Sequence, residues 1–358
     1  MFRLDLETAK DAVYGGQFFG GGGGGQLEDG LKVAQEALSR GAVTVIGLCE
    51  LSPEDTVVTA SLVGSPTDGA PGMTPAHCAS VYELFRRQSP APIAALMANE
   101  AGGQSITNGW ITAAAAGIPM LDAACNGRAH PTGVMGAMLL DQAMGYRTVQ
   151  AAAGGLGGRD LTICVSGSVE STSLLVRQTA ALARSFVTVL RNPAPAAHVR
   201  AHGAPGALRE CIRIGRIFRV HENHPCTLLS ALQRELDCRF LARGVVHNYS
   251  LTAKDGFDMG RAVIRGEAGE LELTFWNEYM TAELCGRRLA TFPDLIVLLD
   301  AATGLPVTSA RLRRGIEVLA AAVPRERLIL SSTMSDPALL APCEAAVGKP
   351  ILNPPETH

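Results

Sequence analysis

Several side chains suited to catalysis follow two neighbouring apolar runs. Glu100 comes soon after the run 93–97, Asp122 follows the run 118–121, and a thiol, an amide, a guanidinium and an imidazole lie just beyond Asp122. A carboxylate can act as a general base or a metal ligand, an arginine can hold an oxygen anion, and a thiolate can attack a carbonyl-like carbon. The predicted catalytic residues are Glu100, Asp122, Cys125, Asn126, Arg128 and His130.

These residue types also have structural explanations, which the sequence leaves open. Asp122 could cap a turn, Arg128 could pair with Glu100 to stabilise the loop, and Cys125 could be a small buried apolar residue.

Six consecutive glycines, 20–25, precede a predicted helix that starts near Gln26. Glycine lets backbone N–H groups converge at a helix N-terminus, where the dipole favours an anion. No G-K-[ST] follows, and the preceding segment 7–15 is helical in pattern, so the loop matches neither a phosphate-binding P-loop nor a dinucleotide fingerprint. We predict substrate binding at this loop, with a ligand-free tight turn as the alternative. The residues concerned are Gly21, Gly22, Gly23 and Gly24.

His221 and His224 lie near Cys226 in the one segment where histidine and cysteine cluster. Together with Asp122 they are candidate ligands for a divalent metal such as zinc. A helix end closed by Pro225 explains the same pattern. The nine cysteines are scattered without a C-x-x-C spacing, which argues against a zinc ribbon and a disulfide framework.

Asn277 and Glu278 end a predicted strand that begins near Leu271. A polar pair at this position forms either a turn or part of a cleft wall.

The elements that must position these residues indicate an α/β fold. Helical patterns at 26–40, 75–88 and 105–116 alternate with strand-like runs at 43–48, 92–97 and 118–121, and a further helix is predicted after Pro131. Such alternation implies a largely parallel sheet with helices on both faces. Ligands bind beyond the carboxyl ends of such strands, so Glu100 and Asp122 are expected to face one cleft.

The second half of the chain is richer in predicted β structure. Residues 151–158 are small and glycine-rich, which predicts a flexible connection, and helical patterns follow at 169–186, 206–220 and 226–236. Short strands separated by turns then run from 239 to 323. The expected domains are 1–165 (α/β) and 166–323 (β-rich), with a tail at 324–358 that has no assigned place.

Composition excludes several classes of function. With 31 basic and 34 acidic residues and no block of like charge, the chain carries no electrostatic footprint for nucleic acid or for a membrane surface. The first residues lack the basic and then apolar pattern of a signal peptide, so we expect a cytoplasmic protein.

Several segments, read in order from about residue 5 to residue 323, resemble the S-methyl thiohydantoin desulfurase family, whose members often occur beside hydantoinase or oxoprolinase proteins. The resemblance is carried by the glycine loop and by 99–108, 117–122, 127–131, 256–260, 276–278, 292–296 and 303–304.

The resemblance implies a hydrolase acting on a five-membered cyclic amide ring. In the name-giving reaction, water replaces a methylthio group to give a hydantoin and methanethiol. The resemblance also implies roles for Asn108, Asn277 and Glu278 in substrate binding. Two alternatives stay open: hydrolytic ring opening, and a non-catalytic subunit of an ATP-dependent hydantoinase. The expected partner is the small cyclic amide, with a second copy or a hydantoinase-type protein as a possible assembly partner.

Three positions depart from the family pattern. The family has an acid where this chain has Ala124, an aromatic where it has His130, and a second acid where it has Thr132. We expect these changes to alter the substrate or the reaction.

Overall fold

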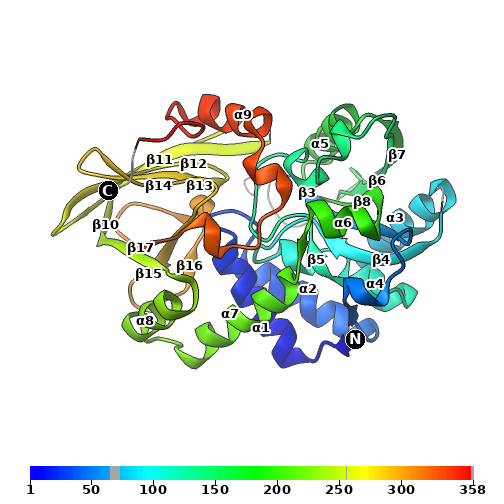
Figure 1. Cartoon of the computed structure of the whole chain (residues 1–358), viewed down its shortest axis with the longest axis horizontal. Coiled ribbons are helices and arrows are strands. Elements are labelled where there is room, and N and C mark those ends of the chain that lie inside the picture. Colours follow the sequence, from blue (N-terminus) through cyan, green and yellow to red (C-terminus); the bar gives the residue numbers. More distant parts are fainter. Residues whose placement is uncertain (65–72, 90, 156, 255, 356–358) are drawn as a thin grey trace.

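The computed structural model describes residues 1–64, 73–89, 91–155, 157–254 and 256–355, which form two sheets lying side by side (Figure 1). The helices α1 and α7 run along one edge of the molecule in this view, and α9 lies over the second sheet. The predicted fold class, an α/β unit followed by a β-rich unit, is confirmed.

The first sheet has the strand order β1-β2-β5-β4-β3-β8-β6-β7, with β9 paired to β5. Its four central strands β2, β5, β4 and β3 are parallel, and the flanking strands pair antiparallel. The strands are β1 (Phe2–Arg3), β2 (Thr44–Ile46), β3 (Thr56–Val63), β4 (Ile93–Ala98), β5 (Met120–Ala124), β6 (Thr148–Gly154), β7 (Leu161–Gly167), β8 (Val187–Pro195) and β9 (Ala204–Pro205). The helices of this part are α1 (Leu6–Phe19), α2 (Leu27–Arg40), α3 (Pro75–Gln88), α4 (Trp110–Ala116), α5 (Val169–Ala183), α6 (Ala196–His202) and α7 (Ala207–Val220).

Both faces of the first sheet are buried because its apolar residues are continuous along each strand. In β4, Leu96 and Ala98 join one apolar cluster while Ala95 and Met97 join another. Successive side chains of a strand point to opposite faces, so an uninterrupted apolar run requires cover on both. Helices supply that cover.

The second sheet is antiparallel throughout, in the order β14-β13-β12-β11-β10-β17-β15-β16. Its strands are β10 (Arg239–Lys254), β11 (Phe257–Gly266), β12 (Gly269–Trp276), β13 (Glu278–Leu284), β14 (Arg287–Thr291), β15 (Leu295–Asp300), β16 (Pro306–Val307) and β17 (Glu317–Val323). Helix α8 (Pro225–Leu236) packs against the β15–β17 region, and α9 (Pro337–Val347) joins the apolar cluster around Trp276 and Phe292.

Two local predictions differ from the structure. The helix expected after Pro131 is a pair of short 3-10 turns, Met135–Ala137 and Leu140–Gln142, separated by two residues with positive φ. The expected flexible connection instead holds strand β6, whose alanines are buried because small side chains fit the crowded middle of the sheet. Leu156 of that segment lies outside the described residues.

The first sheet continues beyond residue 165, since β8 pairs with both β3 and β6. The tail is part of the fold up to residue 355, while residues 356–358 lie outside the described part.

Helices α1 and α7 touch through their backbones, and this contact sets the position of the glycine loop that follows α1. A Cβ at Gly215 would lie 1.7 Å from the carbonyl oxygen of Asp11, and a Cβ at Gly15 would lie 1.9 Å from that of Cys211. The buried Asp11 carboxylate accepts two hydrogen bonds from Arg219, at 2.8 and 3.1 Å.

Among the described helices, none has the length and apolar character needed to cross a bilayer.

Candidate functional site

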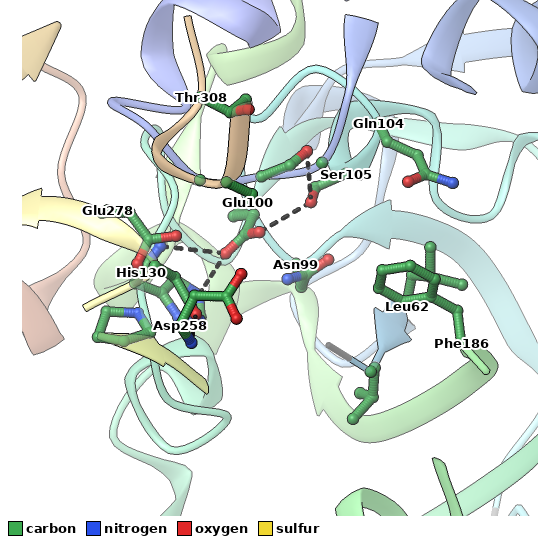
Figure 2. A pocket seen from close by; sticks show the side chains of 18 of the residues that line it. Leu62, Asn99, Glu100, Gln104, Ser105, His130, Phe186, Asp258, Glu278 and Thr308 are labelled. Atoms are coloured by element: carbon green, nitrogen blue, oxygen red, sulfur yellow. Dashed lines mark hydrogen bonds and ion pairs between the residues drawn. The ribbon is translucent and has the colours of Figure 1, made fainter. Parts of the chain in front are cut away.

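A cavity of about 110 Å³ lies where loops of the two sheets meet. Figure 2 shows Glu100, His130, Asp258 and Glu278 gathered at one end, with Leu62 and Phe186 at the other. The lining comes from both halves of the molecule: Gly22–Gln26, the end of β3 (Leu62, Val63, Gly64), the loop after β4 (Asn99, Glu100, Gln104, Ser105), His130–Gly133 after β5, Arg177 of α5, Phe186 and Arg191 at β8, the β11 and β12–β13 region (Asp258, Asn277, Glu278), and Thr308–Ala310.

The glycine loop joins the two halves of the molecule through its carbonyl groups. Gly21 O accepts from Tyr279 N at 2.8 Å, Gly22 O accepts from Ser309 N at 2.9 Å, and Gly24 O accepts from Gln104 N at 2.9 Å. A Cβ at Gly23 would lie 1.9 Å from Glu278 Oε1, so only glycine lets the backbone approach this carboxyl group. The loop therefore forms a wall of the cavity against Glu278.

Glu100 is held in position by two donors. Ser105 Oγ donates to its Oε1 at 2.8 Å, and the backbone N–H of His130 donates to its Oε2 at 3.2 Å. These two donors fix the carboxyl group of Glu100 in the cavity wall, where it can act as a base toward a bound molecule.

Glu278 is only 2% exposed and lies at the same end of the cavity as Glu100 (Figure 2). Burial, and next the charge of Glu100, raise the pKa of Glu278 well above its usual range, while the charge of Arg128 opposes this rise. Among the described residues, Glu278 Oε2 has no hydrogen-bond partner. The raised pKa favours the protonated carboxyl group, which can donate a proton.

The guanidinium of Arg128 stabilises the part of the wall that contains Glu278. It is fully buried, its Nη1 donates to the carbonyl groups of Pro293 and Asp294 at 2.9 and 2.5 Å, and it lies 4.5 Å from the centre of the Phe292 ring. Desolvation lowers the pKa of Arg128 to about 10, so it remains charged. Arg128 does not line the cavity; it links the loop after β5 to the second sheet and acts on Glu278 through its charge.

His130 lies in the cavity wall with its Nε2 atom 3.4 Å from Glu100 Oε2. Burial lowers the pKa of His130, which favours the neutral ring. Neither ring nitrogen has a hydrogen-bond partner within the described ranges. The imidazole is therefore available to a bound molecule.

Asn277 and Asp258 are fixed to each other across β11 and the β12–β13 turn. Asn277 N donates to Asp258 O at 2.7 Å, and Asp258 N donates to Asn277 Oδ1 at 2.9 Å. Asn277 has a positive φ of 57°, which asparagine tolerates better than most residues. The pair aligns Asp258 and Glu278 on one wall.

Besides Arg128 and Gly21, four predicted catalytic or binding residues lie outside the cavity. Asp122 pairs with Arg209, whose backbone N and side-chain Nε approach its two oxygens at 3.0 Å, and burial raises the pKa of Asp122. Cys125 is fully buried against Thr59 Oγ1 at 3.2 Å, and desolvation raises the pKa of its thiol to about 11. Asn126 accepts from Ser331 N at 3.3 Å, and Asn108 donates to the cavity residue Asn99 at 2.8 Å.

The candidate metal ligands are not brought together. His221 follows the end of α7, where its Nδ1 lies 3.1 Å from Thr227 Oγ1, His224 precedes α8, and Asp122 is engaged by Arg209. Throughout the described part of the chain, no group of three or more histidine, cysteine, aspartate or glutamate side chains is placed to hold a metal ion. These residues do not fit a shared zinc site.

Sequence reasoning did not single out several residues of the cavity, among them Ser105, Arg191 and Asp258. Ser105 and Asp258 lie within segments that carry the family resemblance, and Arg191 follows an apolar strand pattern in which a charge is unexpected. Of the three departures from the family pattern, His130 and Thr132 line the cavity, and Ala124 is buried at the end of β5.

Two family models match the chain. One, described as S-Me-THD-like, N-terminal domain, matches residues 7–157, and the other, described as S-Me-THD-like, C-terminal domain, matches residues 168–334. No curated protein matches. The fold is similar to a crystal structure of a protein from Chromobacterium violaceum, with a TM-score of 0.74, 20% identity and coverage of 99% of each chain.

Proposed function

Because the chain belongs to the S-Me-THD-like family, we propose that it hydrolyses a five-membered cyclic ring of the S-methyl thiohydantoin type, with Glu100 as general base and Glu278 as general acid. The observation that carries this proposal is the pair of carboxyl groups at one end of the cavity (Figure 2): Glu100 accepts two hydrogen bonds from protein donors, and burial raises the pKa of Glu278. A carboxyl group that burial favours in the protonated form, beside a second carboxyl group that is differently surrounded, is how one site runs acid and base chemistry together.

In the first step, a water molecule gives a proton to Glu100 while its oxygen bonds to the ring carbon that carries the methylthio group. The electrons of the carbon–nitrogen double bond move to the ring nitrogen, which takes the proton of Glu278. The buried cavity favours this transfer because donor and acceptor are already in place.

In the second step, the tetrahedral intermediate collapses and the carbon–sulfur bond breaks. The new hydroxyl group returns a proton to Glu278, and the departing methanethiolate takes the proton held by Glu100. The products are a hydantoin and methanethiol, and both carboxyl groups regain their starting states.

Cys125 has no part in this scheme. Its thiol is buried away from the cavity and its pKa is raised, so little thiolate forms near neutral pH. Water is therefore the attacking group.

The test measures whether the purified protein turns over a small set of S-methyl thiohydantoins. Methanethiol is measured by gas chromatography, because the exposed Cys49, Cys226 and Cys285 would react with a thiol-specific dye. We expect Glu100→Gln to lower kcat by about 100-fold or more, and Cys125→Ala to stay within a few-fold of the unchanged protein.

Two results would overturn the proposal. A product that gains water and keeps its methylthio group would show ring opening, and a fully folded protein that turns over no ring substrate would favour the non-catalytic subunit.

A further inference from the structure

Strand β7 forms an edge of the first sheet and carries none of the usual protections against further pairing. It pairs with β6 in an unbroken register and with no other described strand, and Figure 1 shows it at the margin of the molecule. Its residues, Leu161–Gly167, include no charge and no proline. Natural proteins usually protect an exposed edge with charged residues, proline, a bulge or a covering element. The edge of β7 is therefore suited to pairing with another strand.

Helix α5, which packs over β6 and β7, presents a second apolar surface. Its exposed positions between residues 171 and 182 hold no charge, and they include Leu174, Leu175 and Leu182, which are 59, 51 and 71% exposed. The exposed positions of α7, by contrast, include Arg209 and Arg213. Clustered apolar side chains on a surface mark an interaction site, whereas scattered ones are ordinary.

The leucines of α5 and the free edge of β7 face the same way. Arg177 points from α5 to the cavity, which is lined by the ends of β3 and β8. Successive helix residues are about 100° apart, so Leu175 and Leu182 lie roughly 140–160° around the helix from Arg177. Because β7 lies on the far side of β6 from β8, these leucines face the edge of the sheet. One partner can therefore contact both surfaces.

The order of residues in β7 fits a second copy of the same strand. In an antiparallel pair centred on Cys164, each residue faces the one at the same distance on the other side of the centre. Ile163 then faces the partner's Val165, and Thr162 faces the partner's Ser166. An apolar side chain meets an apolar one and a hydroxyl meets a hydroxyl, which are stabilising cross-strand pairs.

The charges that flank β7 are complementary in the same arrangement. Arg159 and Glu170 lie on either side of Cys164, both are exposed, and neither forms an ion pair with a described residue. In the pair centred on Cys164, Arg159 of each chain lies beside the partner's Glu170, and the two-fold symmetry forms this contact twice. This self-complementarity favours a second copy over an unrelated protein.

We propose that two copies of the chain form a dimer by antiparallel pairing of β7 with β7 about a two-fold axis at Cys164, with the leucines of the two α5 helices packed beside the joined strands. The pairing satisfies the backbone N–H and C=O groups at both edges, and the packing removes the leucines from water. It also closes an edge that would otherwise promote aggregation.

Analytical ultracentrifugation of the purified full chain over a wide range of concentrations tests the proposal, and we expect the mass of a dimer. The double variant Leu175→Glu with Leu182→Glu should weaken association by about 100-fold or more, because apolar contacts at the centre of an interface are replaced by like charges. Leu6→Glu changes an exposed leucine of α1 and is the matched control, which should leave association unchanged. Circular dichroism and thermal unfolding establish that each variant folds.

Two further double variants test the register of the strands. Thr162→Lys with Ser166→Lys places lysine opposite lysine in the pair centred on Cys164 and should prevent association. Thr162→Lys with Ser166→Glu places lysine opposite glutamate and should restore it. Both positions are exposed, so neither change should disturb a single chain. Equal loss of association in these two variants would refute the pairing about Cys164.

Two other outcomes would overturn the proposal. An unchanged protein that stays monomeric at every concentration would leave the surfaces of β7 and α5 to a different protein. A dimer that persists in the glutamate and lysine variants would place the contact between copies elsewhere on the molecule.

Discussion

The carboxyl group of Glu278 links catalysis to stability. Its pKa is raised in the folded protein from an ordinary value of 4.5. Between that value and the raised one, the folded state holds a proton that the unfolded state has lost, so the free energy of unfolding falls as pH increases. Above the raised pKa the effect reaches a plateau.

We predict that Glu278→Gln removes this decline and abolishes most turnover. Relative to the unchanged protein, the variant should gain stability with rising pH, by at most about 1.4 kcal/mol per pH unit in the affected window. Urea unfolding at about pH 5 and about pH 8 measures the difference. If the variant and the unchanged protein differed by the same small free energy of unfolding at both pH values, the prediction that folded Glu278 holds a proton would be contradicted. In the unchanged protein, turnover should fall as pH passes the raised pKa of Glu278.

At the residue scale, sequence reasoning placed Glu100, His130, Asn277, Glu278 and the glycine loop in segments that do line the cavity. Asp122 differs because β5 extends to Ala124, beyond the end that the apolar run indicates. The side chain of Asp122 therefore belongs to the strand itself, where it meets the first turn of α7 through Arg209. A tertiary contact of this kind leaves no trace in local spacing.

Helices α1 and α7 make a backbone contact that sets the position of the glycine loop. We predict that Gly215→Ala lowers the free energy of unfolding by about 3 kcal/mol or more, since the added Cβ would meet the Asp11 carbonyl oxygen at 1.7 Å. Gly47→Ala is the control, because its φ of −91° suits alanine and its nearest neighbour would be 3.5 Å away. Thermal unfolding of both variants is the measurement; equal transitions would show that α1 can move away from α7.

Most helices and central strands were predictable because their apolar periodicity is local. Helices α2, α3 and α8 lie close to the predicted ranges. The segment after Pro131 has the composition of a helix, but Gly133 and Gly136 leave room for Arg191, which lies far away in the sequence, and Gly136 also leaves room for the His130 ring. Strand β6 was not predictable for the same reason: its alanines fit the crowded middle of the sheet, which local spacing does not reveal.

The whole molecule depends on the segment 324–355, which sequence reasoning could not place. Ile329 O accepts from Gly127 N at 3.1 Å, next to the Asn126 contact with Ser331, and Arg288 Nη1 donates to Pro350 O at 2.8 Å. Leu340, Cys343 and Ile351 are buried with Trp276 and Phe292. This segment closes the second core and supports the loop that contains Arg128 and His130.

We predict that a chain ending at Val323 fails to fold. Removing the segment exposes the apolar side chains of the second core that pack against it. Each large side chain exposed costs roughly 1.5–3 kcal/mol, and the sum is comparable to the stability of a typical domain. Soluble yield and near-ultraviolet circular dichroism are the measurements. A chain ending at Pro355 keeps the described contacts and is the control; equal yields for the two chains would refute the prediction.

The position of residues 324–351 also decides when the cavity can form during synthesis of the chain. Ribosomes add about 5–20 residues per second, and early parts of a chain fold while later parts are still being made. Here the loop behind His130 receives its support from Ile329 and Ser331, about 200 residues further along the chain. A nascent chain therefore lacks this support until that segment has left the ribosome, and the cavity wall around His130 is incomplete before then.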